Sequence, residues 1–205
     1  MKVQTFVTGP IQVNTYVVFD EQSKEGILID VGGAASEITA FVKKNDIKLK
    51  GIYNTHGHFD HVMGAKEIQN VLNIGFYLNK EDLFLVEHLT TQLAMYGIPS
   101  VEPPVITSFI DENVEIMLGD ERVKVISTPG HTPGGICFLA DNLLFSGDTL
   151  FLESIGRTDL PGGDYLTLKN SIREKLFVLN DDVIVYPGHD DPTSILHERK
   201  YNKMV

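Results

Sequence analysis

Short runs of β-branched and aromatic residues alternate with turn residues through the first thirty positions of the chain. Residues 3–7, 13–19 and 26–29 form such runs. Gly9-Pro10 separates the first two, and a polar turn at 20–24 separates the next two. This alternation predicts three strands joined by tight turns.

Beyond residue 30, segments whose apolar residues have helical spacing alternate along the chain with segments whose apolar residues have the spacing of a strand. The pattern predicts helices over residues 35–44, 62–72, 80–96, 166–179 and 194–201. It predicts strands over residues 47–53, 74–78, 114–118, 123–126, 136–139, 143–145 and 183–186. Both halves of the chain therefore place strands before helices. We expect one domain, residues 1–205, in which two β-sheets pack face to face with helices outside.

Composition narrows the class of protein. The 205 residues carry 28 acidic and 17 basic side chains, a net charge of −11. Such a surface repels nucleic-acid backbones and anionic lipids, so we expect neither as a partner. The single cysteine, Cys137, allows no internal disulfide. Residues 1–10 do not read as a signal peptide, and no apolar run approaches the roughly 18 residues that span a bilayer. We therefore expect a cytoplasmic protein.

The most informative segment is a cluster of histidines directly after the predicted strand at 47–53. His56, His58, Asp60 and His61 lie within six residues. Imidazole and carboxylate are ligands that zinc, iron and manganese accept. Three more such residues, His131, Asp148 and His189, each follow a predicted strand in a Gly- or Pro-rich loop. Loops at strand ends are held by rigid sheets, so we expect these side chains to converge.

The spacing also divides these ligands between two ions. In an extended turn, residues two apart project to the same side, so His56 and His58 can bind one ion. The expected assignment places His131 on the same ion, Asp60, His61 and His189 on a second ion, and Asp148 as a bridge between them. Any one histidine alone would be interpreted as a hydrogen-bonded loop residue. The ordered set of seven favours a two-metal site.

The same pieces resemble the metallo-β-lactamase-fold superfamily in kind and order. They are residues 56–61, 128–132, 146–149 and 187–189. The resemblance implies an α/β fold, a four-layer αβ/βα sandwich of two mixed β-sheets with metals at one edge. Asp30 resembles that family's early structural aspartate and is not counted as a ligand. Asp148 stands where true β-lactamases have a cysteine or another residue, so antibiotic hydrolysis is not expected.

The segment 156–164 resembles a stretch of short glyoxalase II-like hydrolases. This likeness implies cleavage of S-2-hydroxyacyl thioesters by a hydroxide that bridges two divalent ions, with zinc preferred to iron or manganese. Asp60 could also accept a proton as a catalytic residue. A similar Gly-Arg-Thr-Asp sequence occurs in persulfide dioxygenases of the same fold. A mononuclear iron dioxygenase on His56, His131 and Asp148 is therefore one alternative, and a non-catalytic metal-binding module is another.

The expected partner is a small acyl-thiol substrate. Full-length glyoxalase II has a C-terminal helical domain that supplies glutathione contacts, and we expect no such domain here because the chain continues only briefly past His189. The thiol carrier, the acyl group and the oligomeric state stay open. Tyr96, Tyr165 and Arg157 are possible substrate contacts. Tyr96 fits helix-end packing better, and Arg157 has Asp159 as an alternative partner.

Overall fold

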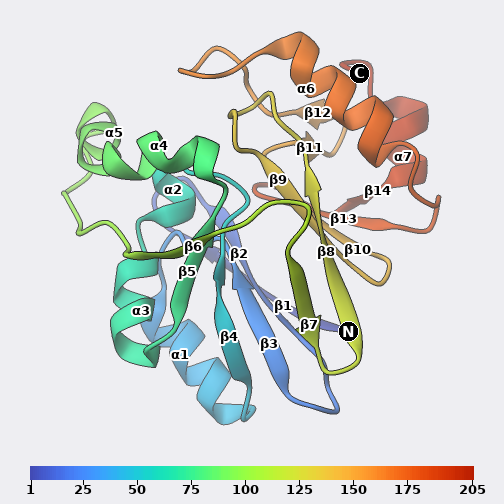
Figure 1. Cartoon of the computed structure of the whole chain (residues 1–205). Coiled ribbons are helices and arrows are strands. Elements are labelled where there is room, and N and C mark those ends of the chain that lie inside the picture. Colours follow the sequence, from blue (N-terminus) through green and yellow to red (C-terminus); the bar gives the residue numbers. More distant parts are fainter.

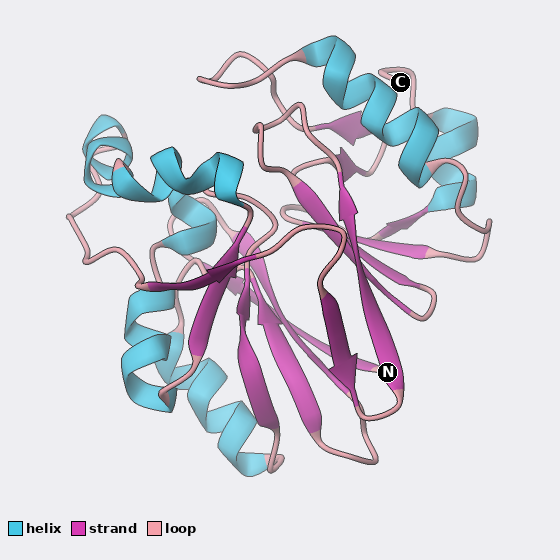
Figure 2. Cartoon of the chain, in the orientation of Figure 1, coloured by secondary structure: helices cyan, strands magenta, loops and turns pink.

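A computed structural model describes residues 1–205 and contains two six-stranded sheets that face each other (Figures 1 and 2). The first has the order β1-β2-β3-β4-β5-β6, formed by Lys2–Thr8, Val13–Phe19, Glu25–Ile29, Lys48–Tyr53, Gly75–Leu78 and Ile106–Phe109. The second has the order β14-β13-β10-β9-β8-β7, formed by Thr193–Ser194, Ile184–Pro187, Leu143–Gly147, Ile136–Ala140, Glu121–Ser127 and Glu115–Leu118. Both contain parallel and antiparallel pairs.

Helices cover the outer faces of the sheets. On the side of the first sheet lie α1 (Ala35–Lys44), α2 (Phe59–Val62), α3 (Ala65–Leu72), α4 (Leu83–Glu87) and α5 (Leu89–Met95), and on the side of the second lie α6 (Tyr165–Ser171) and α7 (Ile195–Tyr201) (Figure 1). This is the expected four-layer αβ/βα sandwich. None of these helices combines the length and apolar character needed to span a membrane.

Strand alternation produces the layers. Tyr16 and Val18 on β2 point into the buried cluster between the two sheets, which also contains Phe138 and Phe145. Val17, between them, points the other way into a second cluster beneath the first set of helices. A third cluster lies between the second sheet and α6 and α7. Because side chains in a strand alternate between its faces, one buried strand contributes to two apolar layers.

Three helices expected as continuous are interrupted. The expected helix at 62–72 starts only at Ala65, as α3, because Val62 ends the separate helix α2 and the chain turns at Met63 and Gly64. A Cβ atom on Gly64 would lie 2.6 Å from the backbone nitrogen of Gly33. The expected helix at 80–96 is a 3₁₀ turn (Lys80–Asp82) followed by α4 and α5, which meet at His88. The expected helix at 166–179 begins at Tyr165 and changes after Ser171 to a π-helical turn, Ile172–Leu176.

The structure also contains strands that the pattern did not predict. β6 is an edge strand whose residues are mostly exposed, so it lacks the alternation that marks a half-buried strand. Gln69 holds the start of this strand by hydrogen bonds to both backbone groups of Val105. β11 (Leu150–Phe151) and β12 (Ser154–Ile155) form a small separate pair, too short to leave a periodic signal.

Candidate metal centre

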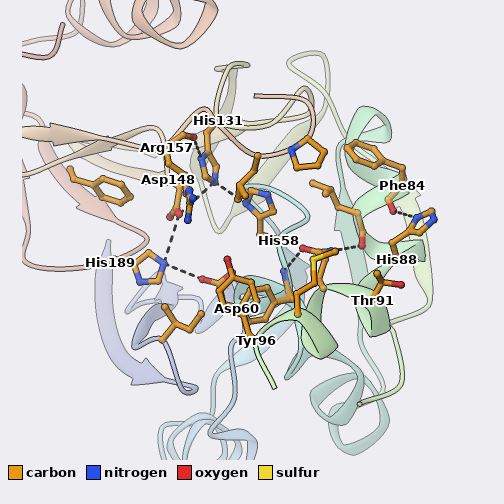
Figure 3. A pocket seen from close by; sticks show the side chains of 18 residues that line it. His58, Asp60, Phe84, His88, Thr91, Tyr96, His131, Asp148, Arg157 and His189 are labelled. Carbon is orange, nitrogen blue, oxygen red and sulfur yellow. Dashed lines mark hydrogen bonds and ion pairs between the residues drawn. The ribbon is translucent and has the colours of Figure 1, made fainter. Parts of the chain in front are cut away.

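The seven expected ligands come from four loops that begin where strands end, and the structure brings all seven together at one edge of the sandwich. The loop after β4 carries the histidine run, which continues into α2. The remaining ligands, His131, Asp148 and His189, follow β8, β10 and β13. Figure 3 shows five of the seven around a single cavity.

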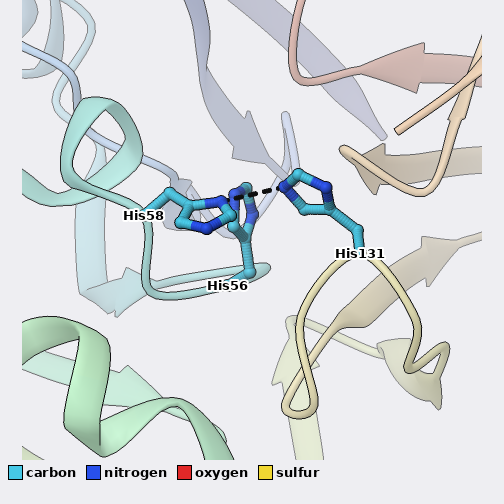
Figure 4. A group of neighbouring side chains, drawn as sticks. All are labelled: His56, His58 and His131. Atoms are coloured by element: carbon cyan, nitrogen blue, oxygen red, sulfur yellow. Dashed lines mark hydrogen bonds between the residues drawn. The ribbon is translucent and has the colours of Figure 1, made fainter. Parts of the chain in front are cut away.

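Three imidazoles form the first cluster. The ligand atoms of His56, His58 and His131 lie within 4.8 Å of one another, and all three side chains are buried. Nδ1 of His58 lies 2.9 Å from Nε2 of His131, with the ring of His56 beside them (Figure 4). The loop thus places His56 and His58 on the same side, as their spacing predicted.

The second cluster combines one carboxylate with two imidazoles. The ligand atoms of Asp60, His61 and His189 also lie within 4.8 Å of one another. Oδ2 of Asp60 is 3.2 Å from Nε2 of His189 and 3.5 Å from Nε2 of His61. Asp60 and His61 are the second and third residues of the short helix α2, and the ring of His61 lies beside that of His56 with centroids 4.1 Å apart, so the two clusters adjoin.

Asp148 lies between the two clusters. Its carboxylate is 3.6 Å from Nε2 of His131 in the first cluster. It is 3.3 Å from Nε2 of His61 and 3.8 Å from Nε2 of His189 in the second. This position, reached from both sides, is the one that a bridging carboxylate requires.

Unpartnered buried atoms test whether metal ions fit these residues. Nε2 of His56, Nε2 of His61 and Oδ1 of Asp148 are buried and make no well-aligned hydrogen bond, although the last two face each other at 3.3 Å. A buried polar atom without a partner costs about 1–3 kcal/mol, so three in one place point to ligands. Nitrogen and oxygen donors in this arrangement suit zinc, iron or manganese. The residues present therefore fit a pair of divalent cations.

Electrostatics at the centre favour bound cations. Burial lowers the pKa of His58 to about 3 and that of His56 well below its ordinary value, which keeps both imidazoles neutral and able to ligate. Burial also works against a charge on His61, yet the carboxylates of Asp148, Asp60 and Asp30 raise its pKa well above normal. The same excess of negative charge would stabilise a metal ion.

Hydrogen bonds behind the ligands fix which ring nitrogen faces the site. Nδ1 of His61 donates to Asp30 at 2.8 Å, and Nδ1 of His131 donates to the carbonyl of Arg157 at 2.7 Å. Asp30 also accepts from the backbone nitrogen and the hydroxyl of Thr55, at 2.8 and 2.7 Å. Each of these histidines therefore presents Nε2 to the centre. Asp30 acts as the structural aspartate that its sequence context indicated.

A buried carboxylate that sequence reasoning missed joins two of the ligand loops. Asp82 accepts hydrogen bonds from the backbone nitrogen of Gly57, the hydroxyl of Thr132 and the backbone nitrogen of Gly134, at 2.9, 2.7 and 2.7 Å. Gly57 separates His56 from His58, and Thr132 follows His131. Asp82 therefore sets the distance between the two parts of the first cluster. No motif or spacing in the sequence marks it.

Two further missed residues hold the loop of His189. The hydroxyl of Tyr16 donates to the carbonyl of Pro187 at 2.6 Å. The side-chain amide of Asn14 donates to Pro187 and Asp190, at 3.1 and 2.9 Å. Both donors come from β2 in the first sheet, so the interface between the sheets positions a ligand carried by the second.

The centre opens into a cavity of about 660 Å³. Its far wall comes from α4 and α5, and Tyr96 packs on Phe59 with ring centroids 4.7 Å apart (Figure 3). Arg157 lines the cavity and pairs with Asp159, which is the second of the two roles expected for it from the sequence. Tyr165 does not line the cavity, because its hydroxyl donates to the carbonyl of Met204.

Comparison with known proteins gives the family. The model of the metallo-beta-lactamase superfamily matches residues 8–189. The hydroxyacylglutathione hydrolase GloC of Haemophilus influenzae is 35% identical over 209 residues, covering 100% of this chain and 98% of that protein. The crystal structure of the BLEG-1 B3 metallo-beta-lactamase superposes with a TM-score of 0.90 at 32% identity, covering 98% of both chains. That of TTHA1623 in a di-iron-bound form gives 0.89 at 31% identity, covering 98% of this chain and 100% of that one.

The chain belongs to the metallo-β-lactamase superfamily, and it is a metallo-hydrolase of that fold with residues able to hold two metal ions. The family and fold expected from the sequence are thereby confirmed. That each of the seven side chains binds metal stays a prediction. The identity of the metals is open, since one of the structural relatives holds two irons.

Proposed function

We propose that this protein hydrolyses thioesters of the S-2-hydroxyacyl-thiol type, as the glyoxalase II-like segment at 156–164 suggested. The observation that carries the proposal is the position of Asp148 between two three-ligand clusters that open into one cavity. The resemblance of the whole chain to a protein named hydroxyacylglutathione hydrolase supports the choice of substrate class.

The charge balance of the site suits this reaction. Two divalent ions, when bound, acidify a water molecule and polarise the substrate carbonyl. Asp60 and Asp148 contribute two negative charges, and the five histidines are neutral as ligands. The excess of positive charge that remains favours the anionic tetrahedral intermediate of acyl transfer.

Proton transfer and leaving-group departure are also accounted for. Asp60 lines the cavity beside His189, so its carboxylate is placed to accept a proton from the attacking water. A thiolate leaving group, with a conjugate pKa of about 8.5, departs without a positioned acid. An amine would need such an acid. Arg157, which lines the cavity, holds its proton too firmly to serve as that acid and is paired with Asp159.

The test combines metal analysis with a substrate panel. Purified protein loaded with zinc, iron or manganese would be assayed for thiol release from S-lactoyl and simple acyl thioesters. Parallel assays would follow β-lactam opening and persulfide-dependent oxygen uptake. We expect two metal ions per chain and thiol release. One iron per chain with oxygen uptake would instead support the dioxygenase, and β-lactam opening without thiol release would overturn the substrate class.

An Asp148→Ala variant separates catalysis from scaffolding. We expect this variant to fold and its rate of thiol release to fall by at least a thousandfold, because no carboxylate then lies between the two clusters. Asp120→Ala, at an exposed turn between β7 and β8, is the matched control and should keep full activity. A folded Asp148→Ala protein with undiminished activity would contradict the proposal.

A further inference from the structure

The cavity continues well beyond the metal ligands, and its outer part is walled by α4, α5 and the loop at 160–161. Apolar side chains supply most of this wall: Ile11, Phe59, Phe84, Leu85, Met95 and Leu160. Apart from Asp60 and Asp148 at the centre, no carboxylate lines the cavity, and no lysine does. A substrate arm that enters this space meets carbon surface.

Two polar side chains of the wall, Gln92 and His88, are hydrogen-bonded to the protein backbone. Oε1 of Gln92 accepts from the backbone nitrogen of Phe59 at 3.2 Å, and its Nε2 donates to the carbonyl of Leu85 at 2.6 Å. Nδ1 of His88 donates to the carbonyl of Phe84 at 2.7 Å. Both ends of the Gln92 amide are thus already bonded to the protein backbone, which fixes its orientation.

The one guanidinium in the cavity is paired with a carboxylate at the exposed rim. Nε and one terminal nitrogen of Arg157 donate to the two carboxylate oxygens of Asp159, at 2.7 and 2.8 Å. This two-point pairing uses the geometry with which arginine would otherwise bind a ligand carboxylate. A charged thiol carrier such as glutathione, with two carboxylates and one ammonium group, would find no lysine here, no arginine that is not already paired, and no carboxylate outside the centre. Placing such charges against apolar walls is costly.

We infer that the preferred substrate is a thioester whose long arm is apolar and uncharged, seated against α4 and α5. This inference rests on the proposed thioesterase function and narrows its substrate class. The apolar arm belongs either to the acyl group, as an aromatic 2-hydroxy acid, or to the thiol. In both cases an apolar arm contacts the wall formed by α4 and α5. The cases differ in whether the acyl side or the thiol side of the ester points toward that wall.

Four substrates distinguish these cases. They are the lactoyl and mandeloyl thioesters of glutathione and of N-acetylcysteamine, assayed with the metal-loaded protein. We expect kcat/KM for the mandeloyl ester of N-acetylcysteamine to exceed that for lactoylglutathione by about tenfold or more, the scale on which an apolar group in a pocket discriminates. A gain from the acyl change alone places the apolar arm on the acyl side, and a gain from the thiol change alone places it on the thiol side. Preference for lactoylglutathione would overturn the inference.

A charge placed on the wall gives a second readout. Met95 lines the cavity with 78% of its surface exposed, so Met95→Lys should fold normally. We expect this variant to lose the apolar preference and to gain activity toward the glutathione esters. Val178→Lys is the control: Val178 is 70% exposed and lies outside the cavity, and its variant should keep the wild-type ranking. Identical rankings in all three proteins would contradict the role of the wall.

Binding without turnover separates this inference from the proposed function. The uncleavable thioethers S-(2-phenylethyl)-N-acetylcysteamine and S-methylglutathione would be titrated into the metal-loaded protein by calorimetry. Tighter binding of the first, weakened by Met95→Lys, supports an apolar subsite even if no thioester is cleaved. Tighter binding of the second overturns the subsite even if thioesters are cleaved.

Discussion

Oδ2 of Asp30 lies 2.8 Å from Nδ1 of His61, and both side chains are buried behind the metal centre. Asp30 directly follows β3, whereas His61 is carried by α2 after β4. The hydrogen bond therefore couples the end of a central strand to a ligand of the second cluster. The same carboxylate holds Thr55, whose hydroxyl lies 3.0 Å from Nδ1 of His56 in the first cluster.

Replacing Asp30 with Asn should weaken metal binding. If the side-chain oxygen of Asn still accepts the hydrogen bond from the backbone nitrogen of Thr55, its NH2 group faces Nδ1–H of His61. Two donors then point at each other. His61 then relieves the conflict by moving its proton to Nε2, the nitrogen needed for the metal. We expect 10- to 100-fold weaker binding of at least one ion, measured by competition with a chromogenic chelator. Unchanged affinity would show that Asp30 does not orient His61, and Asp120→Asn is the surface control.

Asp82→Asn should loosen the first cluster and destabilise the fold. Three donors point at the carboxylate of Asp82, two at one oxygen and one at the other. In Asn the NH2 group would replace the oxygen that accepts from the backbone nitrogen of Gly134, and two donors would face each other. A conflict at a buried site costs about 1–3 kcal/mol of the free energy of unfolding, measurable by urea denaturation of metal-free protein. The control is Asp164→Asn at the exposed start of α6, where Asn caps a helix as well as Asp does. Equal stability of the two variants would contradict the bridging role.

Gly188→Ala should displace the bridging carboxylate. A Cβ atom at this position would lie 2.2 Å from Oδ1 of Asp148 and 2.7 Å from Cε1 of His61. We expect the variant to fold but to hold fewer than two metal ions per chain, as measured by elemental analysis after dialysis. Gly97→Ala serves as the control, since nothing lies within 4 Å of the added Cβ atom. Because φ at Gly97 is +67°, this variant should lose about 1 kcal/mol of stability but keep its full metal content. Full metal content in Gly188→Ala would be inconsistent with this geometry.

Sequence reasoning found the seven side chains that the structure brings together because each leaves a local signal. The histidine run follows a strand that is apolar enough to be recognised, and His131 and His189 sit in loops rich in glycine and proline. Strand β2 and helix α1 were predicted with the bounds that the structure has, since their apolar positions follow one clear period. Local pattern therefore sufficed to find these seven side chains and most strands of the two sheets that carry them.

What escaped prediction depends on contacts between distant segments. Asp82 bonds residues 25 and 50 positions away, and nothing near it in the sequence indicates those partners. The expected helix at 80–96 looked continuous because its apolar spacing continues past His88. In the structure α4 ends at that residue, where φ is −100° and ψ is 18°, and α5 starts again in a new direction. With this break, Phe84 of α4 and Met95 of α5 line the same cavity. The periodicity of the sequence predicted one continuous helix and therefore did not predict this wall of the cavity.

The thiol of Cys137 should be unreactive in the folded protein and should make stability fall in alkali. Its side chain is fully buried on β9, and burial raises its pKa from 9.0 to about 11. The native chain should therefore not react with a disulfide reagent at pH 8, whereas the denatured chain should react with one equivalent. The folded state holds this proton more tightly than the unfolded state does. Stability contributed by the neutral thiol is therefore complete below pH 9 and is lost as the pH rises toward about 11.

Cys137→Ala isolates this contribution. The variant lacks the titrating group, so the difference in the free energy of unfolding between wild type and variant should shrink by about 2–3 kcal/mol between pH 9 and pH 11. Urea denaturation of both metal-free proteins across this range measures the difference and cancels the titration of other residues. A difference that stays constant with pH would mean that the thiol ionises equally well in both states, contrary to its burial between Thr128 and the carbonyl of Ser146.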